Sequence, residues 1–253
     1  MTESKPETVY LYQFAPAKTV RNVSPFCMKI EAFLRIHKIP YENRFITMKR
    51  SKYGLVPFIE LNGQEIADSQ IIQERLKEHF KIPNLPDPKD EAIARFVERM
   101  MDQHTFHVIY KYKLYDNPRK LVDTVADNMH LPGPVDTILR PIMSWRLKGK
   151  ATTRIGTTLG MFSDDEFKLL LHKDLDALRD QLGQKAFFFG DNPTTPDCTI
   201  FGHLAGVYYL PYSTYVKEVL DEKYPSLVHF MERFKQEVFP DDFLPKVEEE
   251  EAK

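Results

Sequence analysis

The sequence predicts an α/β module followed by an all-helical domain. Up to residue 82, short apolar runs of strand type alternate with segments of helical period. Residues 83–88 then read Pro-Asn-Leu-Pro-Asp-Pro, a spacer that can continue neither a helix nor a central strand. Beyond this spacer the helical period dominates. We therefore expect an α/β domain at 1–82, a linker at 83–88 and a helical domain at 89–240.

The first eighty residues follow the order βαβ and then ββα. Ser24 followed by Pro25 predicts the start of a helix, because serine caps helices and proline suits their first position. Asn62-Gly63 is a strong hairpin signal between the last two strands. Asp68-Ser69 predicts the cap of a second helix, with apolar residues at helical spacing behind it. Short apolar or alternating runs predict the strands, at 9–15, 41–47, 56–61 and 65–67.

The second domain is expected to be a helical bundle whose longest helix runs over 89–115. Thr194 with Asp197 three residues on predicts a helix start with a carboxylate capping box. Four basic residues within 146–154 follow Trp145, which suits either a solvated helix end or contact with an anionic co-substrate or lipid head group. The remaining helices are predicted near 119–128, 135–147, 163–182, 212–220 and 225–239.

Composition excludes several classes of function. The 35 Lys and Arg against 37 Asp and Glu give a formal net charge of −2, which argues against a nucleic-acid partner. The two cysteines, Cys27 and Cys198, are too few for a disulfide framework and favour a reducing, cytoplasmic location. No segment reaches the roughly 18 apolar residues of a membrane span, so we expect no integral membrane segment. The acidic tail at 241–253 is expected to be disordered.

Four local features make the chain resemble the glutathione transferase superfamily, which joins a thioredoxin-like domain to a helical bundle. Ser24-Pro25-Phe26-Cys27 is similar to the family's active-site turn, a thioredoxin-type Cys-Pro-x-Cys with its first cysteine replaced. Residues 54–58 are similar to the stretch that holds the family's cis-proline, and Asp68-Ser69 to its acidic residue followed by serine. Residues 189–197 resemble the family's helix-capping motif.

Within the superfamily the chain is more similar to the metaxin and failed-axon-connections branch. The likeness rests on the stretches 24–29 and 224–241. Only 49–54 separates the second strand from the cis-proline stretch, where most transferases place a longer helical segment that helps to hold the glycine end of glutathione. Lys52, or Lys49 or Arg50, is long and cationic enough to replace that ligand, although each also suits a solvated loop.

The resemblance implies a glutathione site on the first domain. The hydroxyl of Ser24 would donate a hydrogen bond to the glutathione sulfur at a helix N-terminus. The alternative is that Ser24 only caps the helix. A cis Pro57 would leave the backbone of Val56 free to pair with the tripeptide; the alternative is an ordinary edge-strand proline. Asp68 and Ser69 would take the γ-glutamyl end of glutathione, and can cap the helix as well.

Three functions remain open. In the first, glutathione is a co-substrate that is conjugated to a small hydrophobic electrophile, a detoxification activity in which Tyr12, Phe14, Phe106 and Tyr110 would wall the second substrate. In the second, the chain is a non-catalytic binding or adaptor protein. In the third, Cys27 is the catalytic residue of a glutathione-dependent thiol oxidoreductase, although a buried structural thiol fits its place as well. The resemblance also allows a homodimer.

No metal is expected at the site. His104 and His107 have a spacing that can chelate a metal ion, but the sequence places no third ligand. Histidines at such spacing also serve helix packing.

Overall fold

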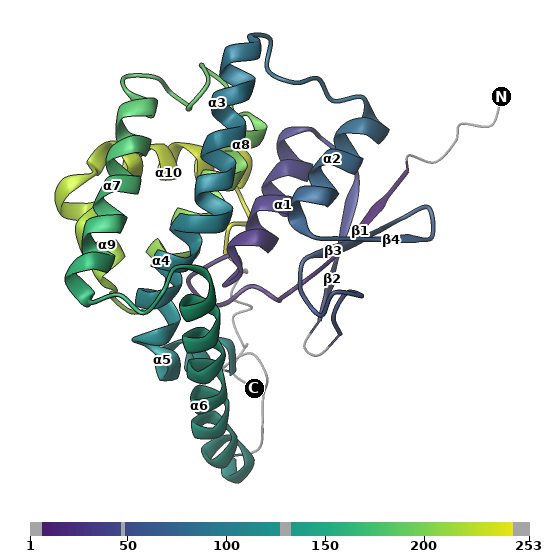
Figure 1. Cartoon of the computed structure of the whole chain (residues 1–253). Coiled ribbons are helices and arrows are strands. Elements are labelled where there is room, and N and C mark those ends of the chain that lie inside the picture. Colours follow the sequence, from purple (N-terminus) through teal and green to yellow (C-terminus); the bar gives the residue numbers. More distant parts are fainter. Residues whose placement is uncertain (1–6, 47–48, 127–132, 245–253) are drawn as a thin grey trace, which may run out of the picture.

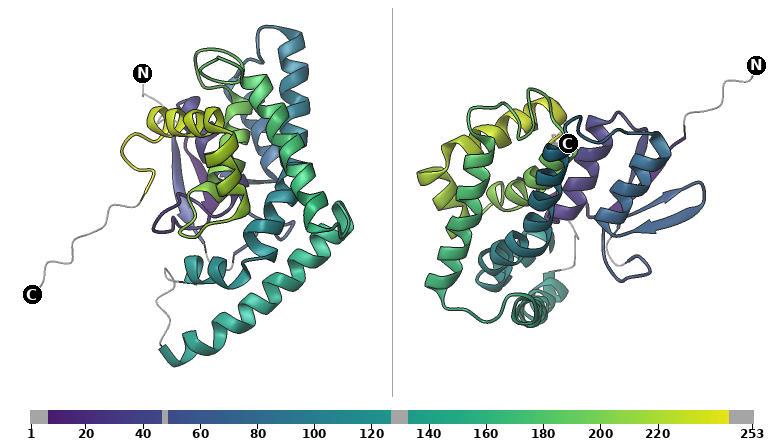
Figure 2. Two further views of the ribbon diagram at one scale, coloured as in Figure 1. Left: turned by 90° about the vertical axis from the view of Figure 1, so that its left-hand side faces the viewer. Right: turned by 45° about the horizontal axis from the view of Figure 1, so that its top comes forward.

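The computed structural model of the chain describes residues 7–46, 49–126 and 133–244. A four-stranded sheet with two helices lies beside a larger set of helices, and the long helix α6 (Gly133–Thr158) projects from them (Figures 1 and 2). The order of elements confirms the predicted βαβ-ββα module followed by a helical domain.

The sheet has the strand order β2-β1-β3-β4. Strand β1 pairs in parallel with β2 and antiparallel with β3, and β3 pairs antiparallel with β4. The end of β1, the start of β3 and the end of β4 therefore meet at one edge of the sheet. The first three strands are shorter than expected, because the β1–β2 ladder ends at Gln13 and Phe45 and the β1–β3 ladder ends at Tyr12 and Phe58. The strands are β1 (Val9–Gln13), β2 (Tyr41–Phe45), β3 (Phe58–Leu61) and β4 (Gln64–Ala67).

Local signals explain the turns and helix starts of this domain. Asn62 and Gly63 both have positive φ, 53° and 75°, as a type I′ hairpin turn requires. Ser24 caps α1 (Pro25–Ile36) and Asp68 caps α2 (Ser69–Phe80), as predicted. Both helices bury an apolar face, and that of α1 includes Met28, Ile30, Phe33 and Leu34.

The predicted helix over 89–115 is present but is not a plain α-helix. It consists of α3 (Pro88–Arg99), the π-helical segment η1 (Met100–Thr105), α4 (Phe106–Tyr110) and a second π-helical segment, η2 (Lys111–Tyr115). Further along, the capping box of Thr194 and Asp197 begins α8 (Thr195–Tyr208), as predicted. The remaining helices are α5 (Pro118–Ala126), α6, α7 (Asp164–Leu182), α9 (Tyr215–Lys223) and α10 (Pro225–Val238).

The prediction for α6 was wrong in its extent. We expected this helix to end near residue 147, but it continues to Thr158. Ala151 and Ile155, one turn apart, are buried on the side where α6 packs against α4, α5 and η2. This packing outweighs the weak helix propensity of Gly149. The basic residues after Trp145 therefore lie within a helix and not at its end.

Helix α8 packs directly against α1 because two of its residues have no side chain. A Cβ atom on Gly202 would lie 2.6 Å from the backbone oxygen of Pro25 and 3.0 Å from the backbone nitrogen of Lys29. One turn later, the nearest atoms to a Cβ on Gly206 are 3.7 Å away. The close approach therefore requires glycine at 202, and it fixes the first turn of α1 against the helical domain.

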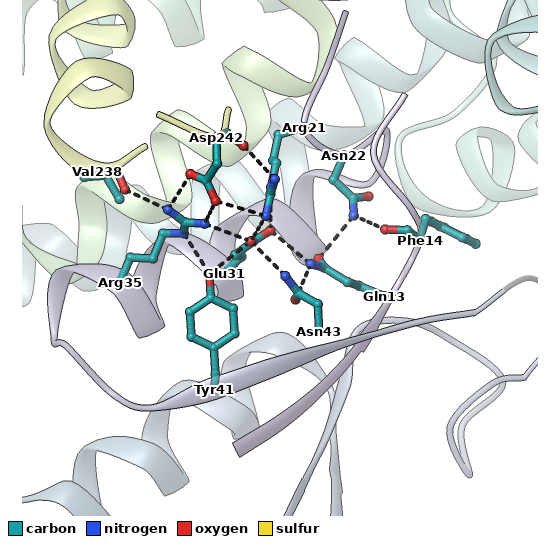
Figure 3. A network of polar contacts seen from close by, with 10 residues as sticks. All are labelled: Gln13, Phe14, Arg21, Asn22, Glu31, Arg35, Tyr41, Asn43, Val238 and Asp242. Carbon is teal, nitrogen blue, oxygen red and sulfur yellow. Dashed lines mark hydrogen bonds and ion pairs between the residues drawn. The ribbon is translucent and has the colours of Figure 1, made fainter. Parts of the chain in front are cut away.

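A polar network joins the segment after α10 to the first domain (Figure 3). Arg35 of α1 forms two bonds to the carboxylate of Asp242, of 2.8 and 2.5 Å. Arg21 donates to the backbone oxygen of Asp242 at 2.6 Å and to the buried carboxylate of Glu31 at 2.5 Å. Phe243 is buried as well. Asp242 and Phe243 thus pack on the fold, within the stretch where we expected a disordered tail; residues 245–253 of that tail lie outside the described residues.

Candidate functional site

Strand register brings the predicted site residues to one edge of the sheet. Phe58 pairs with Tyr12 of β1 and with Ala67 of β4. Pro57 and Asp68 each lie one residue beyond that last pair, so they are neighbours at the edge where β1 also ends. The loop from β1 to α1 returns to the same place, which brings Ser24 to this edge.

Asn22 fixes that loop. Its side-chain amide donates to the backbone oxygen of Phe14 at 2.8 Å and to the side-chain oxygen of Gln13 at 3.1 Å (Figure 3). Its own side-chain oxygen accepts the backbone N–H of Ser24 at 2.9 Å. Asn22 is fully buried and holds Ser24 beside the end of β1. The sequence offered no local signal for this role.

Ser24 caps α1 while keeping its hydroxyl proton. Its Oγ accepts the backbone N–H of Cys27 at 3.4 Å. A serine hydroxyl that accepts a bond can still donate one. The side chain is only half-buried, and it lies at a helix N-terminus, where partial positive charge favours an anion. The arrangement can therefore donate a hydrogen bond to a thiolate.

The Val56-Pro57 peptide bond is cis, as expected from the resemblance. Because the pairing of β1 with β3 ends at Phe58, the backbone of Val56 lies beyond the ladder. Its polar groups are thus placed where an extended peptide could continue the sheet.

Asp68 joins β4 to α2 with an unusual backbone conformation, φ 76° and ψ 126°. Such a positive φ is rare for a residue with a side chain, and strained residues of this kind cluster at functional sites. Its Oδ1 accepts the backbone N–H groups of Gln70 and Ile71, at 2.9 and 3.2 Å. The side chain of Asp68 is exposed, whereas Ser69 is buried. Asp68 therefore caps the helix and presents negative charge at the edge.

Cys27 is enclosed in the protein. It is fully buried, and burial raises the pKa of its thiol to about 12. A thiol with that pKa stays protonated near neutral pH, so it is a poor nucleophile. The structure agrees with a structural thiol and gives no support to the oxidoreductase alternative. Cys198 is also free and buried.

The basic residues of the short segment before Pro57 divide into two groups. Lys49 lies with its Nζ 4.1 Å from the ring centre of Tyr12, and the Arg50 guanidinium lies 5.3 Å from that of Phe14. Both rings belong to the end of β1 or the residue after it. Lys52 instead donates its backbone N–H to Glu65 of β4 at 2.9 Å and lines a hollow along β4 and α2. Lys49 and Arg50 are therefore nearer than Lys52 to the start of α1.

Aromatic residues of the helical domain flank the start of α1. The ring of Phe106 lies 4.9 Å from that of Phe26 and 5.2 Å from that of Tyr110. The guanidinium of Arg154, from α6, lies 4.7 Å from the Phe106 ring. Phe106 and Tyr110 were expected to wall a second substrate; Phe26 and Arg154 join them, and the sequence did not single out Phe26.

A buried lysine of the helical domain, Lys113, binds the backbone just before α1. Lys113 is buried and donates to the backbone oxygens of Val23, at 2.7 Å, and Gly206. Burial lowers the pKa of its amine to about 7. A neutral amine has two N–H groups for these two acceptors.

Nearby, the buried carboxylate of Asp102 binds the side chains of two cations, Lys29 and Arg99, and of His203. Asp102 accepts from Lys29 at 2.8 Å, and its other oxygen is 2.9 Å from His203. Lys29 and Lys113 lie on the buried faces of their helices, a place where a charge needs a partner. That position is the signal by which the sequence could have revealed them.

The two histidines considered for metal binding have other partners. His104 Nδ1 lies 2.8 Å from Asp174, and His107 Nδ1 lies 2.8 Å from the backbone oxygen of Gln103. In the part of the chain that the structure describes, no group of three or more His, Cys, Asp or Glu residues is arranged to hold a metal ion.

Comparison with known families agrees with this geometry. A model described as the glutathione S-transferase N-terminal domain matches residues 25–119, and one described as the glutathione S-transferase C-terminal domain matches residues 171–234. The chain belongs to the glutathione S-transferase family. Within the described ranges, no helix has the length and hydropathy to cross a membrane.

Relatives in this family include proteins of the expected branch. The chain is 31% identical to Failed axon connections of Drosophila melanogaster, covering 95% of this chain and 60% of that relative. It is 24% identical to Metaxin-2 of Mus musculus, over 95% and 92% of the two chains. It is also 23% identical to the isoprene-epoxide–glutathione S-transferase of a Rhodococcus strain, over 90% and 98%.

Solved glutathione transferases share the fold. That of Phanerochaete chrysosporium matches with a TM-score of 0.65 at 15% identity, over 94% of this chain and all of the other. A transferase of Ceriporiopsis subvermispora in complex with glutathione matches with a TM-score of 0.58 at 16% identity, over 94% and 99%. At this level of identity the likeness concerns the fold alone.

Proposed function

We propose that the chain binds glutathione at the sheet edge and conjugates it to a small hydrophobic electrophile. The convergence of Ser24, cis Pro57 and the strained Asp68 at one edge is the observation that carries the proposal. Each of the three meets a different part of the tripeptide. Ser24 would donate a hydrogen bond to the thiolate, and the backbone of Val56 would form hydrogen bonds with the amide groups of the cysteinyl residue. Asp68 and Ser69 would bind the γ-glutamyl end.

The energetic requirement at Ser24 is modest. Lowering a thiol pKa of about 8.5 by two units takes roughly 2.7 kcal/mol. A hydrogen bond to an ionised group contributes about 1.5–3 kcal/mol, and a helix N-terminus about 0.3–1 kcal/mol. The hydroxyl proton of Ser24, once turned toward the glutathione sulfur, and the place of Ser24 at the start of α1 can supply both.

The ends of the site have candidate partners. The glycine carboxylate of glutathione would pair with Arg50 or Lys49, with Lys52 as the more distant choice. The electrophile would contact the half-buried Tyr110, whose ring packs against the buried ring of Phe106. Because one relative is named for an isoprene epoxide, epoxides belong in the panel of trial electrophiles.

Turnover with such a panel tests the proposal. Ser24→Ala should lower kcat by about tenfold or more, while the affinity for glutathione stays within about threefold of that of the unmodified chain. The reason is that the hydrogen bond from Ser24 to the sulfur strengthens as negative charge forms on the sulfur. Ser163→Ala removes a helix cap from α7 in the same way and serves as the control. Equal turnover in Ser24→Ala and in the unmodified chain would refute the role of Ser24.

A second candidate is a non-catalytic binding protein. It is favoured by the described residues 49–57 between β2 and β3, which contain no helix and so leave fewer groups for the glycine end of glutathione. It also fits the similarity to Failed axon connections and Metaxin-2. Folded protein that shows neither glutathione binding nor turnover would support it.

The proposal also includes a cytoplasmic location and a homodimer. The two free, buried cysteines suit a reducing compartment. Cell fractionation and analytical ultracentrifugation measure the two properties.

A further inference from the structure

Helix α6 has an exposed apolar stripe on the side that faces away from the protein. Its members are 43% to 77% exposed: Val135, Ile138, Ile142 and Trp145. At about 100° per residue these positions fall within about 80° of one another around the helix. Ser144, Ala151 and Ile155, which are buried, lie on the opposite side. Figure 2 shows that α6 projects from the bundle, so its outer side is open to a large partner.

Positive charge accompanies the stripe. The helix contains five Lys or Arg residues and one carboxylate, that of Asp136, which Arg140 already binds at 2.6 and 2.7 Å. Arg146, Lys148 and Lys150 are exposed in the turns after Trp145. The whole chain has a formal charge of −2, so α6 is net positive while the rest of the molecule is net negative.

We propose that the outer side of α6 lies on the surface of an anionic lipid bilayer. Aliphatic side chains with a tryptophan on one face, flanked by Lys and Arg, are typical of helices that lie in the membrane interface. Tryptophan favours the head-group level, and juxtaposed Lys and Arg are attracted to anionic lipids. The helix would lie flat, with Ile138, Ile142 and Trp145 among the head groups.

Charge distinguishes this occupant from a second copy of the chain. A two-fold pairing through the stripe would bring the same surface of each copy together. Each α6 has five Lys or Arg residues against one carboxylate, so both paired helices would be net positive, and like charges at close range repel. An anionic surface instead complements both the apolar and the cationic parts of the helix.

Trp145 gives a direct measurement, because it is the chain's only tryptophan. The full chain is titrated with vesicles of phosphatidylcholine containing about 30% phosphatidylserine, and with vesicles of phosphatidylcholine alone. Tryptophan emission should shift to shorter wavelength with the anionic vesicles only, and the protein should sediment with them. Raising the salt concentration to about 0.5 M should weaken binding severalfold, because salt screens the attraction.

Two variants test whether vesicle binding depends on the apolar stripe of α6 or on any exposed apolar residue. Ile138→Asp with Ile142→Asp should reduce vesicle binding at least tenfold, and the exposure of both residues means that the fold is retained, as circular dichroism would verify. Phe96→Asp, at an apolar residue of α3 that is more exposed than either isoleucine, should bind as the unmodified chain does.

Three results would overturn the proposal. The first is no emission shift with anionic vesicles. The second is an equal shift with neutral ones. The third is a lipid-free dimer that the double aspartate variant dissociates, which would assign the stripe to a second copy.

Discussion

Replacing Gly202 by alanine should displace the first turn of α1. The added Cβ would meet the backbone oxygen of Pro25 at 2.6 Å, which is 0.8 Å short of the 3.4 Å at which ordinary contact begins. The atoms that it meets are backbone and cannot rotate away. Overpacking of this kind costs about 1–3 kcal/mol. We expect Gly202→Ala to lower the free energy of unfolding by that amount, despite the better helix propensity of alanine.

Gly206→Ala is the matched control. Its Cβ would have neighbours no closer than 3.7 Å, so only the helix propensity of alanine should count, and the variant should be unchanged or up to about 1 kcal/mol more stable. Urea denaturation measures both variants. Turnover with glutathione should fall in Gly202→Ala alone, since Pro25 adjoins Ser24. Equal stability of the two variants would refute the argument that α8 and α1 approach too closely for a side chain at 202.

Two further substitutions test buried charges, and a third gives a half-exposed comparison. Because burial lowers the pKa of Lys113 to about 7 and a lysine in the unfolded chain has a pKa of about 10.4, the unfolded chain binds an extra proton between these pH values. The free energy of unfolding should therefore rise from pH 7 to 9, and Lys113→Met should flatten the rise; an unchanged slope would contradict it. Asp102→Asn leaves the Lys29 charge buried without a carboxylate and should cost about 3–5 kcal/mol in urea denaturation. Asp242→Asn, at a half-exposed carboxylate, should cost only about 1 kcal/mol, and equal losses would refute the role of burial.

Elements with a local signal were predictable from the sequence. Ser24-Pro25, Asn62-Gly63 and the pair Thr194 and Asp197 each specify a backbone geometry through their own chemistry, and the structure has a cap or turn at each. The length of α6 was not predictable in this way. Its second half is held by packing against helices from other parts of the chain, and its own sequence there, with Gly149 and Gly156, is a weak helix former.

The candidate site also combines residues that belong to local motifs with residues that are placed by contacts between distant segments. The family resemblance supplied Ser24, Pro57 and Asp68, because each belongs to a short motif. The residues that support them depend on contacts between distant segments. Lys113 reaches an oxygen of residue 23, ninety positions earlier, and His203 reaches Asp102 across 101 positions. A lysine on a buried helix face signals that the charge needs a partner, but no local pattern identifies that partner.

Calorimetric titration with glutathione tests the central claim most directly, because it requires no knowledge of the electrophile. The account predicts one site per chain with a dissociation constant between about 1 μM and 1 mM. That site should be lost in Asp68→Ala combined with Ser69→Ala and kept in Asp87→Ala, which removes the equivalent cap of α3. Folded protein that gives no heat at millimolar glutathione, or a double variant that binds as well as the unmodified chain, would contradict it.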